Sequence, residues 1–217
     1  MRLRPSRRSI RGPSDSERVL TLLVTGFGPF LDVPVNPSGL IAERLDGAEL
    51  GSIDGGLKIV GRLLPVAFHA AAVAVTEAIA LYRPTVVVLI GVARGPDYRL
   101  ERVATPIVTS EQPDASGRGH LGLQLGSDPR ESASSVAELA DALGALGFDV
   151  KLSTDCGGYV CNSTYYSALG VAPGAVFLHI PPDTSEAALD HGCSLVRALL
   201  TLLAAPASRR PSGNPSV

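Results

Sequence analysis

Short apolar runs alternate along the chain with segments that have the apolar spacing of helices. Runs rich in β-branched and aliphatic residues predict strands at residues 19–24, 57–66, 85–91, 103–109, 149–153 and 175–180. Helical spacing predicts helices at residues 37–45, 69–82, 132–146, 162–169 and 185–203. Asn36 followed by Pro37 is a typical helix start. The alternation predicts an α/β fold, a single-domain α/β/α sandwich with a central, mostly parallel, twisted mixed sheet flanked by helices.

The two ends of the chain lack this pattern. Residues 1–17 are basic and contain Pro5 and Pro13, so we expect a disordered N-terminal extension whose role the sequence leaves open. Residues 205–217 are expected to form a disordered tail. The folded domain is therefore predicted at residues 18–204. Within it, the polar, glycine-rich residues 110–128 have the length of a functional loop, and the pattern leaves a hairpin there open.

Composition narrows the class of protein. The chain has 217 residues, is 45% hydrophobic, and carries a net charge of −2, which excludes a disordered chain and disfavours a nucleic-acid binder. Its three cysteines form neither a disulfide framework nor a zinc motif, so we expect a reducing, cytoplasmic setting and no metal. The longest apolar run near the C-terminus, residues 198–205, is too short to span a bilayer, so no membrane partner is expected.

Three residues could carry nucleophilic chemistry. Cys161 follows a glycine turn and opens a predicted helix, whose dipole would lower the pKa of the thiol; the alternative is a buried, inert cysteine. His179 ends an apolar strand, where its side chain can project into a cleft. Glu101 could hold the imidazole in one tautomer, although a salt bridge with Arg99 or Arg102 is an equal alternative.

These residues fall in segments that the fold would bring together. In open α/β sheets, sites lie beyond the carboxyl ends of the strands. We expect residues 26–36, 91–101, 155–162 and 179–183 all to lie there. Phe27 and Phe30 could then form an apolar slot, and ordinary core packing is the alternative for both rings.

Four blocks of the chain resemble the pyroglutamyl peptidase I (pyrrolidone carboxyl peptidase) family of cysteine exopeptidases. Residues 23–30 (LVTGFGPF) with 35–38 (VNPS) are similar to its N-terminal signature, and residues 101–104 (ERVA) to its glutamate block. Residues 158–162 (GYVCN), with Tyr166 shortly after, resemble the nucleophile block, and residues 177–181 (FLHIP) the histidine block. The resemblance extends over residues 20–203.

The resemblance implies removal of an N-terminal pyroglutamyl residue (5-oxoproline) from peptides, without a cofactor. Cys161 would be the nucleophile, His179 the general base and acid, and Glu101 the orienting carboxylate. It further implies a homo-oligomer, a dimer or tetramer. The substrate-binding residues that it implies are two rings that sandwich the lactam and three positions at the lactam edge: Phe27, Phe30, Asn36, Val92 and Val160.

One departure from the family pattern leaves an alternative open. Glu111 stands where the family usually has an arginine near the oxyanion, and a carboxylate there would repel the developing charge. Arg94, Arg99 or Arg118 could supply the cation instead, or the alignment with the family could be shifted at this point. A further alternative is a catalytically weak homologue that binds pyroglutamyl peptides. A phosphate-binding α/β protein is disfavoured, because residues 25–30 (TGFGPF) match neither G-x-G-x-x-G nor a P-loop.

Overall fold

A computed structural model describes residues 20–30, 33–51 and 56–205. The predicted N-terminal extension, residues 1–17, and all but the first residue of the predicted C-terminal tail lie outside the described residues. The chain alternates strands with helices from β1 to α5, as the pattern of apolar positions predicts.

The centre of the molecule is a seven-stranded sheet in the order β2-β3-β1-β4-β9-β5-β8. Strands β3, β1, β4 and β9 run parallel, β2 is antiparallel to β3, and β5 and β8 run opposite to β9. The predicted mixed, mostly parallel sheet is confirmed. The strands are β1 (Leu20–Phe27), β2 (Glu49–Leu50), β3 (Leu57–Leu64), β4 (Val86–Val92), β5 (Tyr98–Glu101), β8 (Val150–Ser153) and β9 (Val176–Ile180).

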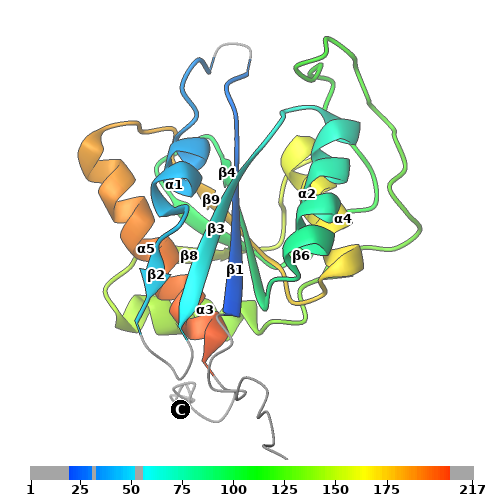
Figure 1. The fold of residues 1–217 in the computed structure, drawn as a ribbon. Coiled ribbons are helices and arrows are strands. Elements are labelled where there is room, and N and C mark those ends of the chain that lie inside the picture. Colours follow the sequence, from blue (N-terminus) through cyan, green and yellow to red (C-terminus); the bar gives the residue numbers. More distant parts are fainter. Residues whose placement is uncertain (1–19, 31–32, 52–55, 206–217) are drawn as a thin grey trace, which may run out of the picture.

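Five helices cover both faces of the sheet, as Figure 1 shows. One layer holds α1, α3 and α5, and the other holds α2 and α4. Together the three layers form the predicted α/β/α sandwich. The helices are α1 (Pro37–Leu45), α2 (Phe68–Tyr82), α3 (Val136–Ala145), α4 (Val160–Val171) and α5 (Glu186–Ala204).

Alternation along the central strands divides the core into two clusters. In β1, Leu22 and Val24 pack toward α1 and α5, whereas Leu23 packs toward α2 and α4. In β9, Val176 and Leu178 pack on the α1 and α5 side, and Phe177 packs on the α2 and α4 side. Because successive side chains of a strand point to opposite faces, a central strand must be apolar at nearly every position. The next residue in phase with Phe177 is His179, which therefore faces α4.

One strand prediction is wrong, and one strand that positions the site was not predicted. Residues 103–109 were predicted to form one strand, but only Val103–Ala104 (β6) is a strand, paired with Arg130–Glu131 (β7). Pro106 lacks the N–H that a continued ladder requires. Conversely, β5 has the sequence YRLE, which alternates polar and apolar residues and is too short and polar to be recognised. β5 and β8 also run opposite to the parallel strands, so their carboxyl ends lie toward the other end of the sheet.

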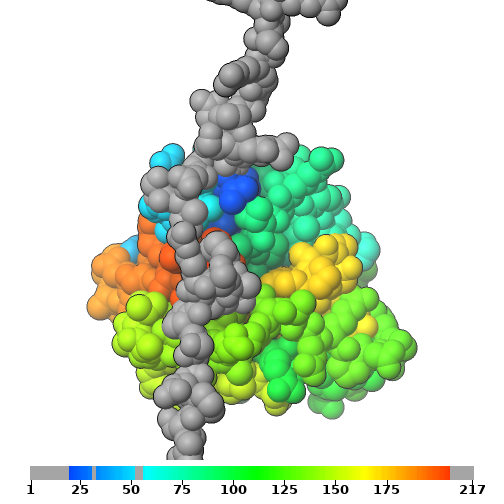
Figure 2. Space-filling view, turned by 90° about the horizontal axis from the view of Figure 1, so that it is seen from below, coloured from blue at the N-terminus to red at the C-terminus, as the bar shows by residue number. Residues whose placement is uncertain are grey.

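Helix α5 is long and apolar enough, by length and composition, to cross a membrane. Its apolar side, however, packs on the sheet, where Leu195, Val196 and Leu199 are fully buried. Figure 2 views the molecule from the end where β1 starts, with α5 (orange) and the end of α4 (yellow) on either side of β1 (blue). These contacts are those of a core helix.

Candidate active site

The candidate site lies where the parallel strands β4 and β9 end. Gly91 of β4 is the register partner of His179 of β9, so the two residues are one strand spacing apart, about 4.8 Å. A Cβ atom added to Gly91 would lie 2.9 Å from Cys161 Sγ and 2.8 Å from Phe177 Cζ. The sulfur therefore occupies the space that the missing side chain leaves, on the same face of the sheet as His179.

Cys161 is the second residue of α4, after the N-cap Tyr159 and Val160. The chain enters this helix through Gly157, whose φ of 76° favours glycine. The first N–H groups of a helix have no partner within the helix. The backbone N–H of Cys161 is thus one of the donors at the positive end of a helix of 12 residues, beside its own sulfur.

His179 and Glu101 form a buried pair behind the cysteine. His179 Nδ1 lies 2.8 Å from Glu101 Oε1, and the two residues are only 4% and 0% exposed. Because an ionised carboxylate can only accept, Nδ1 carries the proton and Nε2 is left as the basic nitrogen. The reversed direction of β5 is what brings Glu101 here, since it sets Arg99 opposite His179 and Glu101 opposite Phe177.

Glu101 also lies near a cation. Arg99 Nε is 3.7 Å from Glu101 Oε1, the oxygen that also contacts His179. The two alternatives for Glu101, a histidine partner and an arginine partner, are therefore both met. Arg102 instead pairs with Glu131 at 3.6 Å. The backbone carbonyl of Glu101 accepts a hydrogen bond from the Tyr165 hydroxyl at 3.0 Å, which joins β5 to α4.

The pKa of Cys161 is raised and not lowered, because the predicted effect of the helix start is outweighed. Burial, and then the negative charge of Glu101, raise the pKa of the Cys161 thiol to about 12, and its own backbone N–H lowers it by less. The thiol is therefore protonated at neutral pH in the substrate-free molecule. It can act as a nucleophile when a neighbouring base removes its proton, and His179 is the base on that face of the sheet.

A cavity of about 310 Å³ opens in front of Cys161. Its wall is mainly apolar, and besides Cys161 it includes every residue predicted to bind substrate, namely Phe27, Phe30, Asn36, Val92 and Val160. Its remaining lining residues are Val33, Val66, Ala93, Arg94, Gln112, Tyr159 and Pro182.

Asn36 has a structural task that the sequence suggests through its N-cap position. Its Oδ1 accepts hydrogen bonds from the backbone N–H and the hydroxyl of Ser38, at 3.1 and 2.8 Å. Its Nδ2 donates to the carbonyl of Gly28 at 3.1 Å, which leaves one N–H of the amide for a ligand. Asn36 can thus donate to a bound molecule but has no free acceptor.

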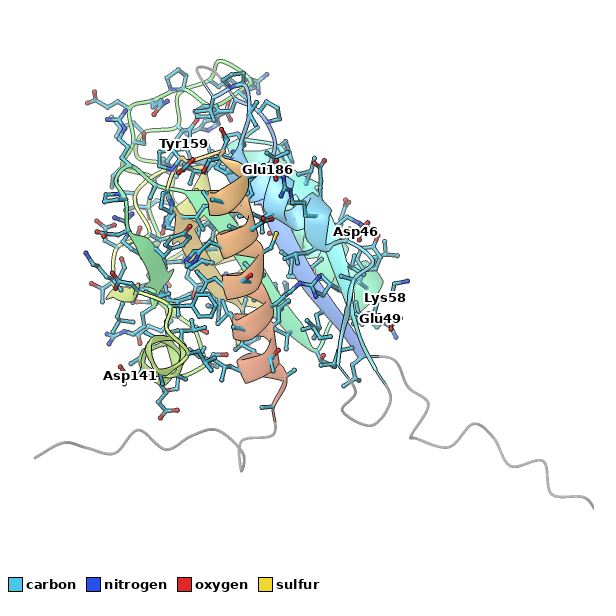
Figure 3. The ribbon with its side chains drawn as sticks, turned by 90° about the vertical axis from the view of Figure 1, so that its left-hand side faces the viewer. Asp46, Glu49, Lys58, Asp141, Tyr159 and Glu186 are labelled. Atoms are coloured by element: carbon cyan, nitrogen blue, oxygen red, sulfur yellow. The ribbon has the colours of Figure 1, made fainter. Side chains whose placement is uncertain are left out.

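Tyr159 is a lining residue that sequence reasoning missed. Its ring lies 5.7 Å from that of Phe30 and 5.3 Å from that of Phe68, measured between centroids, so it closes the aromatic wall. Figure 3 places Tyr159 at the same end of the molecule as Glu186, the first residue of α5, and far from Glu49 and Asp141. Its position next to Val160 in the nucleophile block was the available signal.

The long segment after β6 is fixed against the site. Thr109 N and Ser110 N both donate to the carbonyl of Gly158 at 3.1 Å, and the Tyr159 hydroxyl donates to the carbonyl of Pro113 at 2.9 Å. Farther on, the buried Asp114 accepts from the backbone N–H of Phe68 at 3.1 Å and so caps α2. The hairpin that the sequence pattern left open here amounts to one isolated bridge, between Ile107 and Gln124.

These contacts decide which side chain of the segment reaches the cavity. Gln112 lines it, whereas Glu111 is exposed and is not among the lining residues. Glu111 is therefore a neighbour of a lining residue, exposed to solvent, and not itself part of the cavity wall. Of the three arginines considered as replacements, Arg94 lines the cavity, Arg99 contacts Glu101, and Arg118 does neither.

Neither of the other two cysteines lines the cavity. Cys156 is 2% exposed in the α4 core cluster, and Cys193 packs against the opposite cluster. All three thiols are free. Within residues 20–30, 33–51 and 56–205, no three histidine, cysteine or carboxylate side chains are grouped so that they could hold a metal ion.

Comparison with known proteins agrees with this geometry. The sequence profile of the family described as pyroglutamyl peptidase matches residues 20–196. A pyrrolidone-carboxylate peptidase of Deinococcus radiodurans is 35% identical over 179 residues, which are 77% of this chain and 80% of that protein. One from Pseudomonas fluorescens is 33% identical over 170 residues, 74% of this chain and 78% of that protein.

Solved structures share the fold. The pyrrolidone carboxyl peptidase of Thermococcus litoralis superposes with a TM-score of 0.76 at 21% identity, covering 84% of this chain and 92% of that one. That of Pyrococcus furiosus gives 0.76 at 23% identity, covering 85% and 98%. The match of the profile to nearly the whole described chain, together with relatives above 30% identity, shows that the chain belongs to the pyroglutamyl peptidase family.

Proposed function

We propose that this protein is a cysteine exopeptidase that removes N-terminal pyroglutamate from peptides, with Cys161 as nucleophile, His179 as general base and acid, and Glu101 as the orienting carboxylate. The observation that carries the proposal is that Cys161 lines the cavity and that its sulfur lies against Gly91, the register partner of His179, which in turn contacts Glu101. The thiol at the start of α4 faces an apolar hollow, and the His179–Glu101 pair, joined at 2.8 Å, lies behind it. A small, uncharged lactam suits a hollow of about 310 Å³.

The first chemical step is attack on the pyroglutamyl carbonyl. With the lactam ring between Phe27, Phe30 and Tyr159, the scissile carbonyl lies at Cys161. His179 Nε2 removes the thiol proton as the sulfur bonds to carbon, and Glu101 stabilises the imidazolium that forms. The negative charge on the carbonyl oxygen is stabilised by the Cys161 backbone N–H at the positive end of α4.

The second half of the reaction returns the enzyme to its starting state. The C–N bond breaks, and the departing amine takes the proton from His179, which leaves a thioester on Cys161. Water then adds to the thioester as His179 accepts its proton. Collapse of this intermediate releases pyroglutamate, and the proton returns to the thiolate. No cofactor takes part in these steps.

A chromogenic pyroglutamyl anilide tests the proposal under reducing conditions. We expect the wild type to release the aniline, and we expect Cys161→Ser to lower kcat/KM by at least about a thousandfold, since the hydroxyl is a far weaker nucleophile in this setting. Cys193→Ser, which changes a thiol outside the cavity, is the matched control and should retain wild-type activity.

Two outcomes would contradict the proposal. A folded wild type that binds the anilide but releases nothing would instead be the catalytically weak binding homologue. Activity that survives in Cys161→Ser would mean that another residue is the nucleophile.

A further inference from the structure

Arg94 is a charged residue in a cavity that suits an uncharged ring. Among the residues that line the cavity, all within the described part of the chain, Arg94 alone carries a formal charge at neutral pH. None of the ion pairs formed by the described residues involves Arg94. Its side chain is exposed at the rim. A pyroglutamyl lactam offers nothing for this guanidinium to neutralise.

The reaction itself leaves Arg94 without a partner as well. The oxyanion lies at the start of α4, where the helix provides donors and the positive end of its dipole. Glu101, the carboxylate of the catalytic pair, already contacts Arg99 and His179. Within a bound substrate, the part beyond the scissile bond is thus where Arg94 can meet a negative charge.

Pyroglutamyl peptides have an unusual charge balance, because cyclisation removes the α-ammonium group. A short pyroglutamyl peptide with neutral side chains is thus an anion, whose charge is the C-terminal carboxylate. A guanidinium matches a carboxylate in both charge and planar geometry. Because such a substrate has no α-ammonium group, nothing in it repels the guanidinium.

A second hollow, of about 560 Å³, shows where the departing part can go. It shares Pro182 with the first cavity, and its wall includes Gly95, the residue after Arg94, so Arg94 lies at the border between the two hollows. Asp183 also lines the second hollow, and its charge would repel a carboxylate seated there. A carboxylate bound by Arg94 therefore belongs to the residue directly after pyroglutamate.

We infer that Arg94 is a specificity-determining residue that binds a carboxylate on the residue following pyroglutamate. This inference rests on the proposed function. The carboxylate has two sources, the C-terminus of a pyroglutamyl dipeptide or an acidic side chain in a longer peptide. Both present the same group to the guanidinium.

Paired substrates separate these sources. For the terminal group we would compare pyroglutamyl-alanine with its C-terminal amide, and for the side chain pyroglutamyl-glutamate amide with pyroglutamyl-glutamine amide. We expect wild type to prefer the carboxylate in at least one pair by about tenfold in kcat/KM, the scale of one charge-assisted hydrogen bond. The pair that shows the preference identifies the source.

Arg94→Gln should abolish that preference, so that its loss on the carboxylate substrate exceeds its loss on a neutral pyroglutamyl anilide by about tenfold. Arg118→Gln removes the same charge outside the cavity and should keep the preference. Equal cleavage of both members of each pair by wild type would overturn the inference, as would an equal loss on every substrate in Arg94→Gln, which would place the cation at the oxyanion. Wild type that leaves even the anilide intact would contradict the proposed function itself.

Discussion

At the scale of single residues, opposing electrostatic effects determine the pKa of the Cys161 thiol. Burial and the charge of Glu101 favour the protonated form of Cys161, and the helix start favours the thiolate by less. The same Glu101 orients His179 through a contact of 2.8 Å. Glu101 therefore has two effects of opposite sign, since it makes the thiol harder to ionise and the imidazolium easier to form.

Alkylation of Cys161 by iodoacetamide should follow this balance. Because the pKa of the thiol lies near 12, the thiolate fraction is small at neutral pH and grows about tenfold per pH unit, so the rate should rise throughout pH 7–9 without a plateau. Glu101→Gln removes a charge that raises the pKa and should make alkylation faster at pH 8. Peptide mapping of the labelled protein measures the rate at Cys161 separately from Cys193.

The same Glu101→Gln variant should lose peptidase activity, by about a hundredfold or more, because the imidazolium loses its counter-charge. Faster alkylation together with slower peptide hydrolysis is the expected signature. A plateau in the wild-type profile below pH 8 would contradict the raised pKa, and unchanged hydrolysis in Glu101→Gln would remove Glu101 from the mechanism.

At the scale of elements, the site depends on how closely α4 approaches β4. The start of α4 can place its sulfur over the sheet because residue 91 has no side chain. β9 then supplies His179 in register with Gly91, and the reversed β5 supplies Glu101 from the next position in the sheet. Helix α4 and the antiparallel strands β9 and β5 thus contribute one side chain each to the site.

Gly91→Ala tests this close approach. The added methyl group would lie 2.9 Å from Cys161 Sγ and 2.8 Å from Phe177 Cζ, so both must move. We expect a loss of about 1–3 kcal/mol in the free energy of unfolding. We also expect a fall in activity of at least about tenfold, because displacement of the nucleophile is costly.

Gly144→Ala in α3 is the matched control. Nothing lies within 4 Å of the added Cβ at this position, so the same substitution should stabilise the protein by about 0.5–1 kcal/mol and leave activity unchanged. Denaturant titration and the anilide assay measure both effects. A Gly91→Ala variant with wild-type activity would show that the sulfur does not need this space.

At the scale of the whole molecule, the apolar pattern predicts the sandwich because its central strands are buried on both faces and read as continuous apolar runs. Two short strands, β5 inside the sheet and β2 at its edge, gave no such signal. β5 contains an arginine and a glutamate that have partners only in the folded site, and β2 has two residues. Strand direction was equally hidden, since the reversal at β5 depends on pairing with the distant β9.

The candidate site, like the fold, could be predicted from the sequence only in part. Cys161, His179 and the two phenylalanines could be found from their positions at element ends and from the family blocks. Gln112 could not. Arg94 was one of three candidate cations and Tyr159 lies in the nucleophile block, but their place at the cavity depends on loop contacts such as the hydrogen bond from the Tyr159 hydroxyl to the carbonyl of Pro113. Local sequence does not encode contacts of that kind.

The central claim is that Cys161 carries the pyroglutamyl group during catalysis. Acid quenching during turnover of a pyroglutamyl ester, followed by mass spectrometry of the digested enzyme, measures this directly. We predict that the peptide containing Cys161 gains the mass of one pyroglutamyl acyl group, that hydroxylamine removes the added mass, and that the peptides with Cys156 and Cys193 stay unmodified. An enzyme that turns over the ester while Cys161 is never acylated would contradict the account.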